Sequence, residues 1–317
     1  MFSIKKYFFF LCFALLVACS NNNVAPTEEE ETTESTPMTN ENFTELNVPW
    51  SVIAGFPKAP FTESFQYGPE ELQFGELRMP TTTAPTTGFP VAVFIHGGCW
   101  LNQFDLNHVS QVSADLQSRG YAVWTPEYRR VGDDDGSFPN TFLDAAAAVD
   151  HLREIAQGFP LDLNNVNVLG HSAGGHLALW VAARQNIPSD SPIYTSNPLP
   201  IKKVIALAPI TDLAAYDAVR NSCSQAVQPL MGGTAADQPE RYQNGSPINL
   251  TPLNIPTFLV HGTLDGIVPI QQSEDYRDQA QADGDVAEVI AVEGAGHFDM
   301  VSPNSVAWGQ VVAALRR

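Results

Sequence analysis

Basic side chains are scarce in this sequence. Its 317 residues include 16 Lys and Arg against 35 Asp and Glu, which gives a formal net charge of -19 at pH 7. Proteins that bind nucleic acid gain much of their affinity by placing cations on the phosphates and releasing counterions. The composition therefore argues against nucleic acid as a partner.

Sequence motifs for metal binding are also missing. There is no H-E-x-x-H segment, and the four cysteines do not show the paired spacing of a zinc site. We therefore expect no metal and no other cofactor.

Only one long apolar run occurs, and it stands at the N-terminus. Lys5 and Lys6 precede the apolar residues 7–17, a run too short to span a bilayer comfortably. This pattern predicts a signal peptide over residues 1–18. The segment Leu16-Val17-Ala18-Cys19 resembles the bacterial lipobox, whose cysteine is acylated before cleavage. We expect Cys19 to be the lipid-attachment residue, an ordinary secretory signal being the alternative.

A lipid on Cys19 would hold the protein on a membrane, because every buried CH₂ group contributes about 0.8 kcal/mol. The expected location is the bacterial cell envelope, at the outer membrane, its periplasmic side or the cell surface. Residues 19–45 are polar and include the run Glu28 to Glu31. Such a segment buries little apolar surface and predicts a disordered acidic tether. One catalytic domain is expected over residues 46–317.

Two cysteines, Cys99 and Cys223, remain for this domain. In an exported protein such a pair is a possible disulfide. Two buried free thiols are the alternative, because a bridge requires Cα atoms within about 7 Å of each other.

Strand and helix patterns alternate along the domain. The apolar strand runs are nearly continuous, which is typical of a parallel sheet covered by helices on both faces. The expected fold class is α/β, a mostly parallel sheet with a small cap segment at about 209–252, where periodic signals are few. The predicted strands are 61–67 and 72–79, both antiparallel, then 91–95, 122–125, 166–169, 204–208, 257–260 and 287–292. The predicted helices are 105–118, 141–155, 173–184, one from about 271, and 306–315.

The strongest functional signal is the pentapeptide Gly170-His171-Ser172-Ala173-Gly174. It is a G-x-S-x-G motif placed between a predicted strand and a predicted helix, where a sharp turn exposes the serine at the carboxyl end of the sheet. We predict that Ser172 is a nucleophile.

A serine hydroxyl needs a base, and the base needs an acid behind it. In the chain order serine, acid, histidine, the base is His297, in a Gly-rich loop after the last predicted strand. Asp265, after the strand 257–260, is the predicted acid, and Asp212 is the alternative. Asp299 is too close to His297 in the chain to reach the far ring nitrogen easily.

The other histidines are interpreted as packing or loop-bracing residues. His96, His171, His176 and His261 adjoin predicted strand ends or the elbow, and His108 and His151 lie on predicted helices as surface or packing residues. Four aromatic residues near the strand ends either line an acyl pocket or, more simply, pack in the core: Trp100, Phe104, Trp124 and Tyr128.

Acyl transfer also requires hydrogen-bond donors for the oxyanion. The segment His96-Gly97-Gly98-Cys99-Trp100 follows the strand 91–95, where that loop belongs. The expected donors are the N–H of Gly98 and the N–H of Ala173, with Gly97 and Cys99 as alternates.

These segments, together with Glu127 to Gly132 (EYRRVG), resemble the motifs of bacterial α/β-hydrolases of the esterase and lipase type. The resemblance covers about residues 60–317. Within these hydrolases the chain is similar to the group that includes feruloyl and acetyl-xylan esterase-like enzymes and the kynurenine formamidases, which have a similar HGGxW loop. Cys99 departs from the third glycine of hormone-sensitive-lipase-like esterases.

The resemblance and the predicted residues imply a serine hydrolase that cleaves small-molecule carboxylic esters through an acyl-enzyme. An arylformamidase or an exported peptidase would use the same machinery. An inactive binding module with this fold is the non-enzymatic alternative, and the intact set of site residues argues against it.

Overall fold

The structure, a computed structural model, describes residues 43–317, which belong to one compact unit of the chain. The predicted signal peptide, Cys19 and the predicted tether as far as residue 42 lie outside the described residues. Next to the predicted start of the domain at 46, Thr44 and Glu45 both donate backbone hydrogen bonds to the Asn304 carbonyl, at 2.9 and 3.1 Å.

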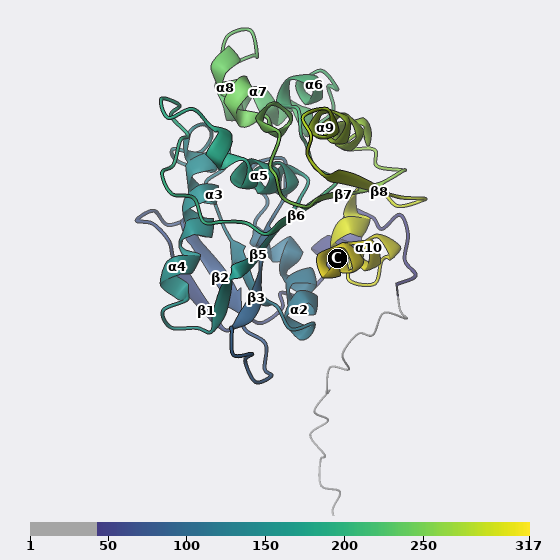
Figure 1. Ribbon diagram of the computed structural model, residues 1–317. Helices are drawn as coiled ribbons and strands as arrows, with labels where there is room; N and C mark the ends of the chain where they lie inside the picture. The colour runs from purple at the N-terminus through teal and green to yellow at the C-terminus, as the bar shows by residue number, and fades with distance from the viewer. Residues whose placement is uncertain (1–42) are drawn as a thin grey trace, which may run out of the picture. The chain divides into compact units, whose positions relative to one another are not determined.

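An eight-stranded sheet forms the centre of the domain (Figure 1). The strand order is β1-β2-β4-β3-β5-β6-β7-β8. Strands β3 to β8 run parallel, whereas β2 is antiparallel to both β1 and β4. The predicted fold class, a mostly parallel α/β-hydrolase sheet, is confirmed. The strands are β1 (Glu63–Gln66), β2 (Phe74–Arg78), β3 (Phe89–Ile95), β4 (Ala122–Pro126), β5 (Leu161–His171), β6 (Lys203–Leu207), β7 (Thr257–Gly262) and β8 (Ala287–Val292).

Helices cover both faces of this sheet. In β3, Val91, Val93 and Ile95 belong to one hydrophobic core, and Ala92 and Phe94 to another. Successive residues of a strand point to opposite faces, so a strand buried on both sides is apolar throughout. Residues of α3, α5 and α9 contribute to the first core, and residues of α2 and α10 to the second. The long helices are α2 (Ser110–Ser118), α3 (Asn140–Asp150), α5 (Ala173–Ala182), α9 (Gln271–Ala282) and α10 (Val306–Arg316).

Two predicted helices are each divided in two. The predicted helix 105–118 begins as the 3-10 helix η1 (Leu106–Val109), because the Asp105 side chain accepts the Asn107 N–H at 2.9 Å and caps a tighter turn. The predicted helix 141–155 is α3 followed by the short α4 (Leu152–Ile155). The five-residue helix α1 (Trp50–Ala54), which precedes the sheet, was missed because it is too short to show a period. Within residues 43–317, no helix has both the length and the apolar composition needed to cross a bilayer.

The predicted cap segment 209–252 contains three short helices, α6 (Leu213–Asp217), α7 (Val227–Met231) and α8 (Pro239–Gly245). Figure 1 shows them gathered at one end of the domain. None has enough turns to produce a periodic pattern. The remaining 3-10 turns are η2 (Arg184–Asn186), η3 (Ser224–Ala226), η4 (Pro247–Leu250) and η5 (His297–Val301).

Candidate active site

Ser172 lies in the turn that joins β5 to α5. Its backbone has φ 57° and ψ -119°, a conformation that is strained for a residue with a Cβ atom. The turn requires glycine on both sides. A Cβ at Gly170 would lie 2.0 Å from the Gly174 carbonyl oxygen, and a Cβ at Gly174 would lie 2.2 Å from the Ile95 carbonyl oxygen. The sequence motif therefore folds as a tight elbow with Ser172 at the carboxyl end of the parallel strands.

His297 and Asp265 are in direct contact. The Nδ1 atom of His297 lies 2.7 Å from Oδ2 of Asp265, and both side chains are buried. The other carboxylate oxygen, Oδ1, accepts the N–H groups of Ile267 and Val268 at 2.8 and 2.9 Å. Burial by itself raises the pKa of Asp265, but the charge of His297 and hydrogen bonds from His261 and His297 outweigh it and hold that pKa well below its ordinary value. Asp265 is therefore a carboxylate at neutral pH.

Ser172 and His297 line the same cavity, which has a volume of about 280 Å³. The elbow also contacts the histidine loop directly, since Nε2 of His171 lies 3.0 Å from the carbonyl oxygen of His297. The apolar part of the lining comes from Trp50, Phe104, Ile267 and Phe298. The predicted nucleophile and base thus line one cavity, and the predicted acid contacts the base.

The predicted oxyanion loop passes against Ser172. A Cβ at Gly97 would lie 3.2 Å from the Cβ of Ser172, and Gly98 and Cys99 line the cavity. Ala173 is the first residue of α5, and the first N–H groups of a helix have no intrahelical partner. All four residues predicted to supply donors, directly or as alternates, therefore lie beside the serine.

A disulfide joins Cys99 to Cys223, with Cα atoms 5.2 Å apart. Cys99 belongs to the oxyanion loop and Cys223 to the cap segment. Cys223 and its neighbour Ser222 also line the cavity. The cap segment is thereby attached to the loop that carries the predicted donors.

The two other acids considered from the sequence have different roles. Asp212 caps α6, and its Oδ1 accepts the N–H groups of Ala214 and Ala215 at 2.9 and 3.0 Å. Asp299 accepts the N–H groups of Val48 and Gly296, each at 2.9 Å. Neither carboxylate is oriented toward the His297 ring by these bonds.

Several lining residues were missed from the sequence. His108, predicted to be a surface or packing residue, lines the cavity; burial lowers its pKa to about 3, so its ring is neutral. Trp50 of α1 also lines the cavity, although nothing in its sequence neighbourhood indicates this. Among the four aromatics predicted for either role, Phe104 lines the cavity, while Trp100, Trp124 and Tyr128 are buried in the core.

In the part of the chain that the structure describes, no three His, Cys, Asp or Glu side chains are grouped so as to hold a metal ion. The site chemistry available from these residues is that of serine, histidine and carboxylate.

The family model BD-FAE matches residues 76–279. This match covers more than half of the 317 residues. The chain belongs to the BD-FAE family. The match includes the elbow and Asp265, and it ends before His297.

Two curated relatives of this BD-FAE protein are esterases by name. The esterase LipC of Mycobacterium tuberculosis is 26% identical over 228 residues, which cover 68% of this chain and 55% of LipC. The isoprenylcysteine alpha-carbonyl methylesterase ICME of Arabidopsis thaliana is 24% identical over 252 residues, which cover 75% of this chain and 56% of ICME. The chain thus spans about half the length of these relatives.

Solved structures show the same fold. A truncated carbohydrate esterase from gut microbiota superimposes with a TM-score of 0.68 at 19% identity, covering 81% of this chain and 98% of that one. Esterase B from Lactobacillus rhamnosis (HN001) superimposes with a TM-score of 0.69 at 20% identity, covering 80% and 84%. The predicted resemblance to α/β-hydrolase esterases is confirmed by the family match and by this fold.

Proposed function

We propose that this BD-FAE family member is a serine carboxylesterase that hydrolyses small-molecule carboxylic esters through an acyl-enzyme on Ser172. The observation that carries the proposal is the 2.7 Å contact between His297 and Asp265 beside the cavity that Ser172 lines. A histidine held in this way can act as a base toward a serine hydroxyl on its other side. The esterase names of LipC and ICME support the same reaction class.

In this reaction His297 takes the Ser172 proton as the hydroxyl oxygen attacks the ester carbonyl. The Asp265 carboxylate keeps the other imidazole proton on Nδ1 and stabilises the cation that forms. The N–H groups of Gly98 and Ala173 donate to the oxyanion of the tetrahedral intermediate. His297 then protonates the leaving alcohol, and a water activated by the same histidine releases the acid from Ser172.

The cavity favours a small or flat acyl group. Its volume of about 280 Å³ is at the lower end for ligand pockets, and aromatic rings provide much of its apolar lining. A short aliphatic or an aryl acyl chain fits such a space, whereas a long acyl chain would extend out of it.

The proposed setting is the bacterial cell envelope, with a lipid on Cys19 and a tether between the anchor and the domain. The basic n-region, the apolar run and the lipobox-like segment before Cys19 support this proposal. Labelling cells with an alkyne fatty acid tests it. Incorporation into the wild type and none into Cys19→Ala is expected, and equal labelling of both would contradict the anchor.

Replacing the nucleophile tests the enzymatic proposal. Ser172→Ala should lower kcat/KM for p-nitrophenyl acetate by more than about a thousandfold, because removal of a triad nucleophile typically costs at least that much. The control is Ser118→Ala on α2, whose hydroxyl bonds the Asp115 carbonyl at 2.7 Å and which should retain full activity.

A Ser172→Ala enzyme with more than about a thousandth of wild-type kcat/KM would refute the mechanism. Testing N-formylkynurenine and a peptide p-nitroanilide beside the esters separates the amidase alternatives. A preference for either amide over all esters would replace the carboxylesterase proposal.

A further inference from the structure

The oxyanion loop has an unfavourable backbone. Gly98 has φ +110°, and Cys99 and Trp100, which both carry a Cβ atom, have φ 54° and 55°. For a residue with a Cβ atom this conformation is unfavourable, and it persists only where the surroundings hold it. The residues that hold this loop therefore determine where its N–H groups point.

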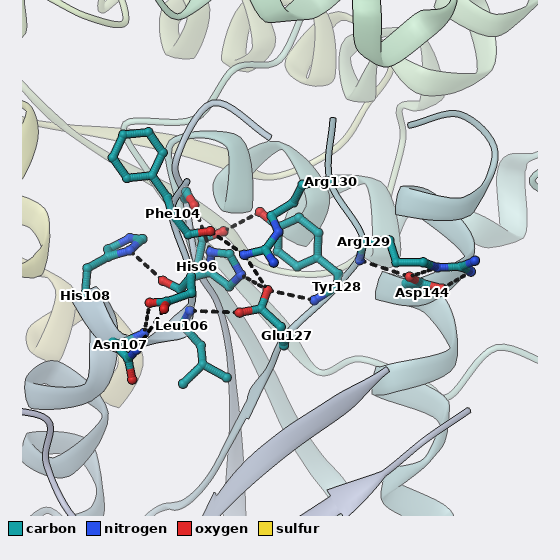
Figure 2. Close-up of polar contacts among 12 residues, drawn as sticks. His96, Phe104, Leu106, Asn107, His108, Glu127, Tyr128, Arg129, Arg130 and Asp144 are labelled. Atoms are coloured by element: carbon teal, nitrogen blue, oxygen red, sulfur yellow. Dashed lines mark hydrogen bonds and ion pairs between the residues drawn. The ribbon is translucent and has the colours of Figure 1, made fainter. Parts of the chain in front are cut away.

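Glu127, which follows β4, joins the two ends of this loop. Its side chain is buried, with Oε1 2.7 Å from Nε2 of His96 and Oε2 accepting the Leu106 N–H at 3.2 Å (Figure 2). Burial by itself raises the pKa of Glu127, but His96 and Arg130 outweigh it and hold that pKa below its ordinary value. A buried carboxylate with both oxygens engaged connects His96, before the glycines, to Leu106, after the loop.

His96 carries this restraint to the predicted donors. Its other ring nitrogen, Nδ1, lies 2.8 Å from the carbonyl oxygen of Gly97. Both ring nitrogens of His96 thus lie within hydrogen-bond distance of an oxygen atom, one of Glu127 and one of Gly97, and these two contacts fix the orientation of the ring. In a trans peptide the carbonyl and the following N–H point in opposite directions. Holding the Gly97 carbonyl on the His96 side therefore turns the Gly98 N–H away from that ring.

Neighbouring groups complete the network around His96. The Tyr128 hydroxyl donates to the His96 carbonyl at 2.9 Å, and its ring stacks on the imidazole with centroids 4.4 Å apart (Figure 2). Arg130 lies 3.0 Å from Glu127 Oε1, donates to the Phe104 carbonyl within the loop, and pairs with Asp133. His108 packs edge-on against His96, with ring centroids 5.7 Å apart. Arg130 is thus paired with two carboxylates, and one of them, that of Glu127, also contacts His96.

We propose that Glu127 is a positioning residue of the oxyanion hole. Through His96 and Leu106 it fixes the orientation of the Gly97–Gly98 peptide, so that the Gly98 N–H donates to the developing oxyanion. This inference rests on the proposed esterase function and assigns a role to the EYRR segment that the reaction steps above leave unused. Glu127 acts only through the loop and does not contact the reacting atoms.

Glu127→Gln tests this role with almost no change in side-chain size. An amide has only one acceptor oxygen, so it cannot accept hydrogen bonds from His96 and Leu106 with separate oxygens as the carboxylate does, and it removes the negative charge beside His96. We expect kcat for p-nitrophenyl acetate to fall by about 10- to 100-fold with KM changed by less than about threefold, because loss of a whole oxyanion donor costs about 10²- to 10³-fold. The affinity for a phenyl trifluoromethyl ketone, whose adduct carries an oxyanion, should fall in the same proportion.

Asp115→Asn is the matched control. Asp115 is also a buried carboxylate, bonded to Arg119 at 2.7 Å and to the Trp308 indole at 2.6 Å between α2 and α10. Its variant should lose stability but keep kcat and ketone affinity within about twofold of the wild type, since these bonds do not reach the loop.

A Glu127→Gln enzyme with kcat within about threefold of wild type would overturn the inference, as would a kcat loss without a matching loss of ketone affinity. If circular dichroism shows that this variant does not fold, Tyr128→Phe provides the same readout. It removes one bond to the His96 carbonyl and should lower kcat and ketone affinity together by up to about tenfold; unchanged values would overturn the inference. Activity surviving in Ser172→Ala would instead refute the proposed function itself.

Discussion

At the scale of single residues, the contacts of Asp265 distinguish it from the other carboxylates considered as the acid behind His297. Both of its oxygens are engaged, one by His297 and the other by the backbone N–H groups of Ile267 and Val268. Because these donors belong to the backbone, they hold the Asp265 carboxylate in a fixed orientation toward the imidazole. Asp212 has an equivalent pair of backbone donors, but they belong to the first turn of α6 and orient it as a helix cap.

Asp265→Asn should therefore lower kcat/KM for p-nitrophenyl acetate by about 10³- to 10⁴-fold, because an amide no longer holds the Nδ1 proton and favours the wrong tautomer. Asp212→Asn is the matched control. It should keep kcat/KM within about threefold and lower the free energy of unfolding by at most about 1 kcal/mol, since asparagine also caps helices. An Asp212→Asn enzyme as damaged as Asp265→Asn would show that the acid is wrongly assigned.

At the scale of elements, the site is completed by two segments that lie outside the regular alternation of strands and helices. The short α1 contributes Trp50, whose ring lies 5.6 Å from that of Phe104 and 5.3 Å from that of Phe298. The cap segment contributes Ser222 and Cys223. The parallel sheet positions the reacting groups, and these two segments shape the space in front of them.

Trp50→Ala should enlarge the acyl space, because the indole is part of the cavity lining. We expect the ratio of kcat/KM for p-nitrophenyl octanoate to that for p-nitrophenyl acetate to rise by about tenfold, the order of discrimination that one or two methylene groups provide in an apolar pocket. The control is Phe61→Ala, since Phe61 is an exposed aromatic residue. An unchanged ratio in Trp50→Ala would mean that the acyl chain binds elsewhere.

Cys223→Ser should loosen both the cap segment and the oxyanion loop. A bridge between residues 124 apart stabilises by about 5 kcal/mol in the chain-entropy model, so the free energy of unfolding should fall by up to that amount. The variant should also have a lower kcat, because Cys99 adjoins the predicted donors. Peptide mapping of unreduced, alkylated wild-type protein is the check: alkylated Cys99 and Cys223 would contradict the bridge.

At the scale of the whole molecule, buried histidines make stability depend on pH. His176 is fully buried, accepts the Trp100 indole N–H at 3.2 Å and lies 2.8 Å from the Gly245 carbonyl. These partners require a neutral ring with its proton on Nε2. Burial lowers the pKa of His176 from its ordinary 6.5 to about 4.

The unfolded chain therefore binds a proton at His176 below about pH 6.5, and the folded protein does so only near its own pKa of about 4. Its contribution to the free energy of unfolding should fall as the pH decreases through this window, by about 1.4 kcal/mol per pH unit. Urea unfolding at pH 7, 6 and 5 measures this slope. His176→Gln should reduce the slope by about that amount, and His151→Gln, at a half-buried site, should reduce it less; equal slopes in wild type and His176→Gln would contradict the assignment.

The charge of the whole chain bears on its partners more than on its fold. A formal charge of -19 repels polyanions and favours solubility. It is consistent with a neutral, small-molecule ester as the substrate, because binding in an apolar cavity does not depend on long-range attraction.

Short-range patterns in the sequence determined much of this protein. The elbow at Ser172, the glycine loop after β3 and the order of strands and helices all depend on residues within a few positions of one another. Such local patterns predict the parallel sheet, and the common edge at which its strands end places Ser172, Asp265 and His297 near each other. The break between α3 and α4 near His151 was not predicted, and neither were the short helices α6, α7 and α8 of the cap segment. Short helices are stabilised by packing against the rest of the protein, and they have too few residues to show a periodic pattern.

Only the tertiary structure decided which of these residues meet. The contact of Asp265 with His297, the position of His108 and Trp50 at the cavity, and the bonds of Glu127 to His96 and Leu106 join residues far apart in the chain. Whether such side chains touch depends on strand register, helix packing and loop path, and a difference of a few ångströms in any of these would separate them. No pattern of neighbouring residues contains that information.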